Sequence, residues 1–195
     1  MYNFRIIDQT HCYAYFTKTF SSTECKEIIK LASKIKTEKA QVSRKKNNQT
    51  EFIEDHEVRK CNIKWITQNN DTSWIYDRIV GTILELNNQF FGFDITTIED
   101  IQFTNYKAPD GFYKEHVDRI FEQPVRKISF SVQLTEKDKY EGGDLILNDG
   151  SENINPYKNI GDLICFPSYI LHEVTPVTKG ERNALVGWIG GKNFK

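Results

Sequence analysis

The sequence predicts an α+β fold that is mainly β, a β-sandwich or barrel buttressed on one side by two helices. Apolar residues recur at helical spacing in the first half of the chain, and from about residue 98 short β-like runs alternate with turn residues. The size also fits, because 195 residues with 38% hydrophobic side chains suit one packed domain. We therefore expect a single domain over 1–195, with helices and supporting strands in 1–97 and the β-rich core in 98–192.

The first helix is expected over residues 22–36. The stretch SSTE, Ser21 to Glu24, is a capping-box pattern, because a serine is followed three residues later by a glutamate. Apolar side chains then recur at helical spacing, at Cys25, Ile28, Ile29, Ala32 and Ile35. This pattern is typical of an amphipathic helix with one buried face.

A second helix is expected after Asp71, which can cap it. Its buried stripe would be Trp74, Ile75, Ile79, Ile83, Leu86 and Phe90. The polar stretch 37–57, which contains the basic run Arg44-Lys45-Lys46, is interpreted as a long solvated loop or mobile flap. In the run RKCNIKWI that follows it, apolar and polar residues alternate, which indicates a half-buried strand.

Further runs in the second half are typical of strands: IEDIQFTNYK, RKISFSVQL, GDLILND, GDLICFP and ALVGWIG. Turns between them are expected at Pro109-Asp110-Gly111, at Glu141 to Asp144 and at Thr178-Lys179-Gly180. Strand ends of an antiparallel barrel can bring residues distant in sequence to one mouth. We therefore look for a functional site in this half of the chain.

The composition limits the partners and the location that we expect. A formal charge of −1 indicates neither a nucleic acid nor a membrane partner. The N-terminal residues lack the layout of a signal peptide, and no apolar run approaches membrane length. Cys12, Cys25, Cys61 and Cys165 form no CxxC pair, so we expect reduced, mostly buried thiols and a cytoplasmic protein.

The stretch YKEHVDRI contains a histidine and an aspartate two positions apart. On an extended segment His116 and Asp118 point the same way, because side chains alternate with period two. An imidazole and a carboxylate on one face can provide two ligands of a metal ion. Alone, the pair is more typical of a surface histidine near an aspartate.

The third ligand is expected to be His172. His11 precedes the first helix and His56 lies in the polar stretch, whereas His172 follows an apolar strand at the start of the next turn. His116, Asp118 and His172 would then place two histidines and one carboxylate on one face of an ion. This arrangement leaves coordination positions open and is typical of non-haem Fe(II) oxygenases. The alternative is a His172 that only bonds a backbone carbonyl at a strand end.

Arg182, ten residues after His172, supports the metal site. It begins the last predicted strand and has the same parity as Ala184, Val186 and Trp188, so the four share one face. An arginine that faces a barrel interior needs an anion, because an unpaired buried charge is very costly. Its planar fork suits a carboxylate bound at two points.

Taken together, these motifs resemble the Fe(II)- and 2-oxoglutarate-dependent dioxygenases, specifically the prolyl 4-hydroxylase-like branch. The resemblance covers about residues 98–192 and includes HVD, RKISFSVQL, YEGGDL, GDLICFPSYILHEVTPV and LVGWIGG. Two earlier runs, FTKTFSSTECKEII and VRKCNIKWI, are also similar to this branch. The resemblance implies a double-stranded β-helix, or jelly roll.

The resemblance also implies a role for individual residues. His116, Asp118 and His172 match the iron ligands, and no further catalytic side chain is implied. Arg182 matches the basic residue that pairs with the far carboxylate of 2-oxoglutarate. Tyr106 matches a tyrosine that contacts this cosubstrate, whereas Gln133 stands where related enzymes often have another tyrosine.

Three more positions match residues that line the peptide site of prolyl hydroxylases: Tyr113, Arg126 and Trp188. Tyr113 and Trp188 could equally be core aromatics, and Arg126 could be a solvated charge at a strand end. The polar stretch 37–57 and the loop RIFEQP, Arg119 to Pro124, are expected to rim the mouth of the site.

The implied reaction uses Fe(II), 2-oxoglutarate and O2, with ascorbate as a candidate reductant, and releases succinate and CO2 as the substrate is hydroxylated. Prolyl residues in a peptide or protein are the expected substrate. A free amino acid or a small metabolite is an alternative. Two other classes stay open: a zinc hydrolase, which would give Arg182 no task, and a jelly-roll metal-binding module without catalysis.

Overall fold

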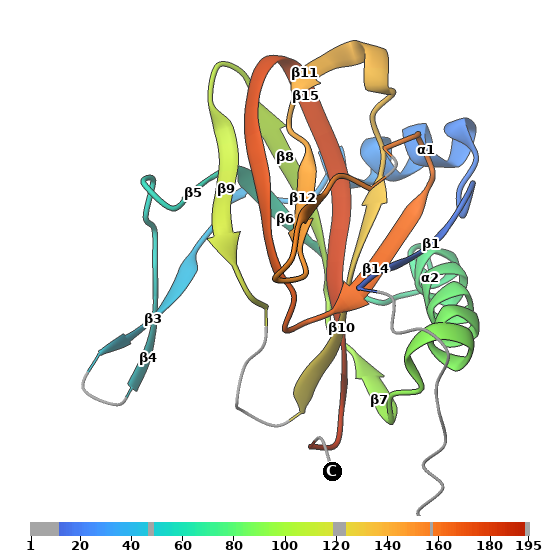
Figure 1. Cartoon of the computed structure of the whole chain (residues 1–195). Helices are drawn as coiled ribbons and strands as arrows, with labels where there is room; N and C mark the ends of the chain where they lie inside the picture. Colours follow the sequence, from blue (N-terminus) through green and yellow to red (C-terminus); the bar gives the residue numbers. More distant parts are fainter. Residues whose placement is uncertain (1–11, 47–48, 119–123, 157, 194–195) are drawn as a thin grey trace, which may run out of the picture.

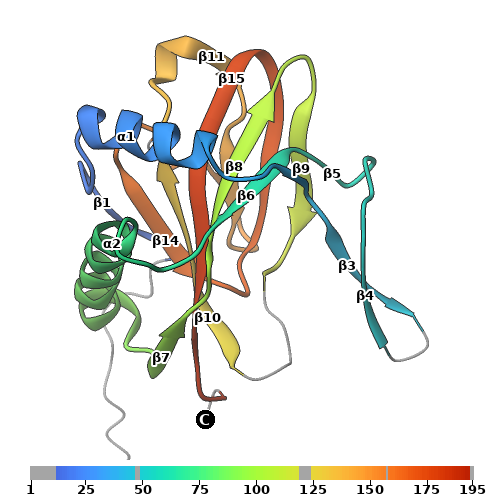
Figure 2. The same ribbon diagram turned by 180° about the vertical axis from the view of Figure 1, so that it is seen from behind.

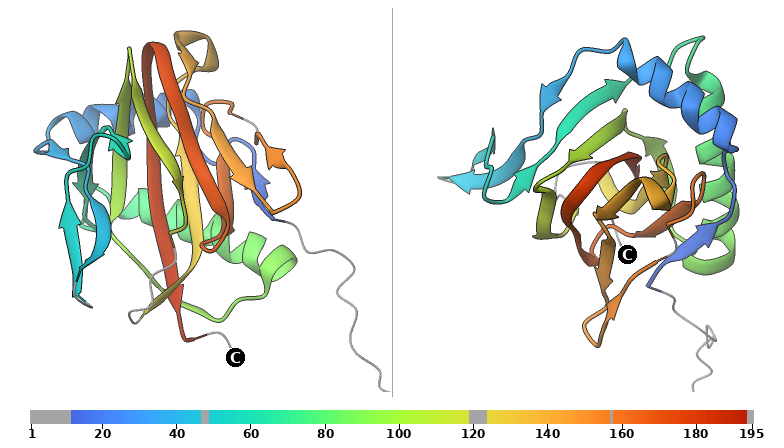
Figure 3. Two further views of the ribbon diagram at one scale, coloured as in Figure 1. Left: turned by 60° about the vertical axis from the view of Figure 1, so that its left-hand side comes forward. Right: turned by 90° about the horizontal axis from the view of Figure 1, so that it is seen from above.

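The structure is a computed structural model that describes residues 12–46, 49–118, 124–156 and 158–193. Two antiparallel β-sheets face each other, and both include the long strand β15, Leu171–Gly191 (Figure 1). Seen from above, the strands curl around a shared interior while two helices lie outside it (Figure 3). This is the mainly β architecture, with supporting helices, that the sequence predicts.

The larger sheet is formed by strands from both halves of the chain, and its principal order is β1-β14-β10-β15-β8-β6-β2. The strands are β1 (Ala14–Phe16), β14 (Leu163–Pro167), β10 (Val125–Gln133), β8 (Ile101–Lys107), β6 (Asn62–Ile66) and β2 (Glu38–Lys39). β7 (Ile95–Ile98) also pairs with the C-terminal part of β15. The sheet therefore combines the predicted supporting strands with the predicted core.

The smaller sheet pairs with the first part of β15. Its strands are β5 (Arg59–Lys60), β9 (Gly111–His116), β11 (Tyr140–Gly142), β12 (Leu145–Asn148) and β13 (Asn153–Ile154). A 3-10 turn, η2 (Lys137–Lys139), leads into β11. The predicted turn at Thr178-Lys179-Gly180 is instead part of β15, at the point where this strand passes from one sheet to the other. Gly180 has a positive φ of 72° there.

Helices α1 (Ser22–Ser33) and α2 (Ser73–Leu86) cover the outer face of the larger sheet (Figure 2). The predicted capping box at Ser21 and Glu24 is confirmed, although α1 ends three residues before the predicted end. The predicted cap of the second helix is wrong, because Thr72 and not Asp71 is its N-cap residue. The Thr72 hydroxyl instead donates to the Thr67 carbonyl. A π-helical turn, η1 (Asn87–Phe91), extends α2.

The main hydrophobic core lies between these helices and the outer face of the larger sheet. Ile28 of α1 and Ile79 of α2 are fully buried, as are Ile128 of β10 and Leu185 of β15. The residues next to them in these strands face the other way, into the space between the two sheets. The larger sheet therefore has an apolar outer face, and its inner face is available for a polar site.

The prediction of a loop over residues 37–57 is wrong in its central part. β3 (Val42–Lys46) and β4 (Gln49–Ile53) pair in an antiparallel hairpin that projects from the body of the molecule in Figure 1. The basic run Arg44-Lys45-Lys46 therefore lies in a strand. The polar composition hid the hairpin, because its two strands show little apolar alternation in the sequence.

All four cysteines are free, as predicted, but only Cys25 and Cys165 are buried, whereas Cys12 and Cys61 are half-buried. Among the described residues, no helix is both long enough and apolar enough to cross a membrane.

Replacing Ser21 with alanine should lower the free energy of unfolding by about 1 kcal/mol, because it removes the side-chain half of the capping box. Hydrogen bonds from the Ser21 backbone and side chain lower the pKa of Glu24 from 4.5. The stabilisation from ionised Glu24 is therefore present above pH 4.5 and is lost as the pH falls through its lower folded pKa. Urea unfolding at neutral and acidic pH measures both effects. Ser33→Ala, in the last turn of α1, is the control and should change stability less.

Candidate metal centre and anion pocket

Three buried or half-buried side chains converge between the two sheets: His116, Asp118 and His172. Their ligand atoms all lie within 4.8 Å of one another. The Nε2 atom of His116 is 3.6 Å from Asp118 Oδ1, and Nε2 of His172 is 3.4 Å from Asp118 Oδ2. The structure thus brings together the three residues that the sequence predicts as metal ligands.

Strand pairing positions these residues. His116 is the last residue of β9, and it lies opposite His172 in the register between β9 and β15. Asp118 follows β9, and its backbone N–H donates to the Ser168 carbonyl at 3.0 Å. The prediction that His172 starts a turn is wrong, because it is the second residue of β15. A strand holds the imidazole more rigidly than a turn would.

Backbone carbonyls fix the orientation of both imidazoles. Nδ1 of His116 lies 2.7 Å from the Lys114 carbonyl oxygen, and Nδ1 of His172 lies 3.0 Å from that of Ile170. A carbonyl oxygen only accepts, so each Nδ1 carries the proton and donates it. Each Nε2 is then left as the metal-binding atom, directed at Asp118. These residues fit a divalent metal ion held by two nitrogens and one carboxylate.

The charges of the cluster suit a cation. Burial, followed by the neighbouring His172, lowers the pKa of His116 to about 4. Burial also opposes protonation of His172, but the Asp118 carboxylate outweighs it and raises the pKa of that imidazole. Although burial alone would raise the pKa of Asp118, the two imidazoles hold it well below 3.8. At neutral pH the cluster therefore offers an ionised carboxylate and a neutral His116, the forms that bind a metal.

Ser129 on β10 holds the carboxylate in place, and sequence reasoning missed it. Its hydroxyl donates to Asp118 Oδ2 at 2.8 Å and lies 3.0 Å from the Ser168 hydroxyl. Ser129 has the same parity in β10 as Gln133, so both side chains belong to the inner face. This parity is the signal in the sequence that could have identified it.

Arg182 is buried on the same inner face, as predicted. Its Nε donates to Gln133 Oε1 at 3.1 Å, and its guanidinium carbon lies 5.6 Å from the centroid of the Tyr106 ring. The Gln133 amide nitrogen donates in turn to the Thr135 carbonyl and the Tyr140 hydroxyl, both at 2.9 Å. Gln133 therefore orients Arg182, and in the described part of the chain Arg182 forms no ion pair with a carboxylate.

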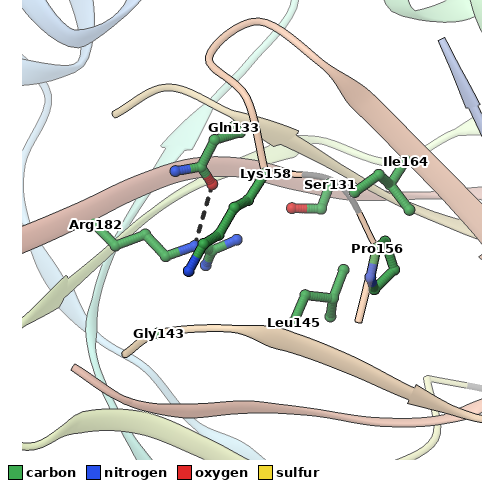
Figure 4. Close-up of a pocket in the computed structure, with 8 residues that line it drawn as sticks. All are labelled: Ser131, Gln133, Gly143, Leu145, Pro156, Lys158, Ile164 and Arg182. Atoms are coloured by element: carbon green, nitrogen blue, oxygen red, sulfur yellow. Dashed lines mark hydrogen bonds between the residues drawn. The ribbon is translucent and has the colours of Figure 1, made fainter. Parts of the chain in front are cut away.

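A small pocket opens in front of Arg182 (Figure 4). Ser131 and Gln133 of β10 line one side, and Ile164 of β14 lies beside them. Lys158 also points into it, from the segment before β14. On β10 the pocket begins two residues after Ser129, so metal cluster and pocket are neighbours along one face of one strand. A ligand with one end at the metal and a carboxylate at Arg182 would lie along this face.

Tyr113 stacks directly on a proposed metal ligand. Its ring centroid is 3.5 Å from that of His116, with 18° between the planes. The guanidinium of Arg59 lies over the Tyr113 ring, with its carbon 4.5 Å from the ring centroid. Arg59 is buried and donates to Cys61 Sγ and Gln102 Oε1. Sequence reasoning missed Arg59, because its burial follows from the pairing of β5 with β9.

Arg126 and Trp188 lie together at the other side of the cluster. The Arg126 guanidinium is 3.8 Å from the centroid of the Trp188 ring, and it donates to both carboxylate oxygens of Glu99 at 2.6 Å. The Trp188 indole nitrogen is near enough to Asp118 to help lower the pKa of its carboxyl group, but it completes no hydrogen bond within the described residues. Contact of either residue with a substrate stays a prediction. The loop predicted to rim the site, Arg119 to Pro124, lies outside the described residues except for Pro124.

Residues 101–190 match the family model described as the 2OG-Fe(II) oxygenase superfamily. All nine predicted site residues fall within this range. A PKHD-type hydroxylase of Prochlorococcus marinus (strain AS9601) is 43% identical over 94 residues, which are 47% of this chain. The chain covers 42% of the length of that protein.

Solved structures confirm the jelly-roll fold. A prolyl-4-hydroxylase of Pseudomonas putida has a TM-score of 0.70 at 20% identity, covering 94% of this chain and 95% of that one. A prolyl hydroxylase of Trichoplax adhaerens, in complex with a hypoxia inducible factor peptide fragment, has a TM-score of 0.71 at 16% identity. That match covers 92% of this chain and 83% of the other.

Replacing Ser129 with alanine should weaken binding of a divalent metal by roughly 10- to 100-fold, because Asp118 loses the donor that orients it. The measurement is a titration of the protein with Mn(II) or Fe(II) under anaerobic conditions. Ser131→Ala, two residues along the same face of β10, is the matched control and should leave metal affinity unchanged. Equal metal affinities for Ser129→Ala and wild type would contradict the role of Ser129.

Proposed function

We propose that this chain, whose residues 101–190 match the 2OG-Fe(II) oxygenase superfamily model, is an Fe(II)- and 2-oxoglutarate-dependent dioxygenase that hydroxylates prolyl residues in a peptide or protein. One observation carries the proposal. The cluster of His116, Asp118 and His172 lies next to a pocket whose far end is the buried Arg182. A hydrolytic zinc site would use the cluster but would leave Arg182 without an anion.

The residues divide the task between the two ends of the site. His116, Asp118 and His172 would hold iron through Nε2, a carboxylate oxygen and Nε2. Arg182 would bind the far carboxylate of 2-oxoglutarate. Gln133 would orient the guanidinium by accepting its Nε hydrogen bond, and the Tyr106 ring would pack beside it. Bound iron, with 2-oxoglutarate and O2, would supply the oxidation that inserts one oxygen atom into a C–H bond and releases succinate and CO2. The buried inner face excludes water around these groups.

The position of the cluster supports a large substrate. Val117, between two of the proposed ligands, is 49% exposed, so the metal end lies close to the surface. The Tyr113 ring stacks on His116 at this end, and Arg126 lies on the buried Trp188. The peptide complex of the Trichoplax adhaerens protein supports a peptide substrate by likeness of fold. We also propose a cytoplasmic location, since free thiols persist in a reducing compartment.

The test is succinate formation by protein loaded anaerobically with Fe(II) and then given 2-oxoglutarate and air, with and without a proline-rich peptide. Wild type should form succinate, and the peptide should stimulate it. His172→Ala should abolish turnover. Arg182→Gln should weaken 2-oxoglutarate binding about 100-fold, because a charged, two-point hydrogen bond contributes about 3 kcal/mol. Arg182→Lys keeps the positive charge but loses the two-point hydrogen bonding of the guanidinium. Its affinity for 2-oxoglutarate should therefore lie between those of wild type and Arg182→Gln.

The outcomes separate the proposal from its rivals. Succinate formed equally with and without peptide would establish the oxygenase but exclude that peptide as its substrate, and a free amino acid or small metabolite would then be tested in its place. Metal binding without any 2-oxoglutarate binding would contradict the oxygenase and favour a metal-binding module or a hydrolase.

Tyr113 offers a separate test of the peptide site. Burial raises the pKa of its hydroxyl to about 12, so it is a neutral donor at physiological pH. In the described part of the chain the hydroxyl forms no hydrogen bond, which leaves it available to a substrate. Tyr113→Phe keeps the ring that stacks on His116 and should raise the KM for peptide about tenfold. Metal and 2-oxoglutarate affinities should not change. An unchanged KM would exclude the hydroxyl from the peptide site.

A further inference from the structure

The pocket in front of Arg182 has a second cation in its wall, Lys158. Both side chains point into the pocket in Figure 4, and no carboxylate is among the described residues that line it. Two like charges that face one small pocket repel each other, and burial strengthens the repulsion. The arrangement favours an anion between them more strongly than Arg182 alone would.

Lys158 is at present paired with Asp144. Its ammonium group donates to the Asp144 carboxylate, and it lies 5.5 Å from the centroid of the Tyr140 ring. This pair is half-buried, with side-chain exposures of 38% and 25%. A lysine ammonium has three donors on a flexible stem, and the contact with Asp144 uses one of them. The other two donors can therefore bind an anion in the pocket.

Gly143 brings Asp144 and Lys158 close to Arg182. A Cβ atom at Gly143 would lie 3.1 Å from Cδ of Arg182 and 3.5 Å from Cε2 of Tyr140, so the backbone passes directly over both side chains. Gly143 also has a positive φ of 61°, which favours glycine. Asp144 is the next residue, and its side chain holds Lys158. The ends of the Lys158 and Arg182 side chains therefore lie side by side in the pocket that Gly143 also lines (Figure 4).

We propose that Lys158 is a second cationic ligand for the carboxylate held by Arg182, and that Asp144 neutralises Lys158 while no anion is bound. The inference rests on the proposed function, since the anion is the far carboxylate of 2-oxoglutarate. Two cations make the pocket selective for a 2-oxo acid with a second carboxylate. A 2-oxo acid that lacks it would leave Arg182 without an anion and Lys158 on Asp144.

The test compares the dissociation constants of 2-oxoglutarate for Mn(II)-loaded wild type and variants, measured by anaerobic calorimetry. Lys158→Gln should weaken binding about tenfold, because it removes one charge-assisted hydrogen bond. Asp144→Asn should strengthen binding a few-fold, because Lys158 is released from its counter-ion. Lys179→Gln is the matched control. It breaks the exposed Lys179–Glu141 pair outside the pocket and should change nothing.

The opposite signs of the two variants distinguish a ligand role from a structural one. If Lys158 and Asp144 only hold the fold together, both substitutions weaken 2-oxoglutarate binding alike, and the inference is overturned. A second probe, 2-oxopentanoate, has no far carboxylate. Wild type and Lys158→Gln should bind it with equal, low affinity, whereas an equal loss for both acids would also overturn the inference.

The proposed function fails in a different way. If wild type binds no 2-oxoglutarate, both the function and the role of Lys158 are wrong. If Arg182→Gln loses affinity and Lys158→Gln does not, the function stands and only the role of Lys158 is overturned.

Discussion

The structure depends on the two-residue alternation of side chains along β8, β10 and β15. One face of these strands is apolar and packs against α1 and α2, where Ile128, Phe130 and Leu185 are almost fully buried. The other face presents polar side chains to the space between the sheets, among them Ser129, Gln133 and Arg182. The period of a strand is two, so a shift of one residue in register would exchange the faces. Hydrophobic burial by the helices thus fixes which side chains reach the site.

A polar interior is stable only when its groups are bonded, because each unsatisfied buried group costs free energy. Most of this network is satisfied within the chain: Ser129 holds Asp118, and Gln133 holds Arg182. The hydrogen bonds of this network are mostly satisfied, but its electric charges are not balanced. The metal end has an ionised carboxylate between two imidazoles, and the pocket end has Arg182, which forms no ion pair among the described residues, whereas Lys158 is paired with Asp144. The excess is negative at one end and positive at the other, as a bound cation and a bound carboxylate require.

The sequence was sufficient for the features that depend on local periodicity. The His-x-Asp pair, the parity of Arg182 and the capping box each follow from residues near one another. The structure confirms the capping box, the burial of Arg182 and the proximity of His116 and Asp118, whereas their functional roles stay predictions. Ser129, Arg59 and Lys158 were missed because their roles arise from pairing between distant segments, such as β5 with β9. The start of the second helix was misplaced by one residue because Thr72 belongs to a local turn, in which its hydroxyl donates to the Thr67 carbonyl and accepts from the Asn69 backbone N–H, and no side chain caps the helix. The hairpin β3–β4 was missed because both of its strands are polar.

The separation of an apolar outer face from a polar inner face also indicates which residues the domain must include. Residues 98–192 contain the whole proposed site, but the apolar side chains that cover the outer face of its strands come from 1–97. Phe20, Ile28, Ile75 and Ile79 all belong to the same core as Ile128 and Phe130. Burying such side chains contributes roughly 1.5–3 kcal/mol each, which is large against a total stability of about 5–15 kcal/mol. Without residues 1–97 the strands would expose this face to water, and the polar inner face could not replace it as a core. We therefore propose that 1–195 is one folding unit, in which the helices provide the stability that allows the strands to hold a charged site.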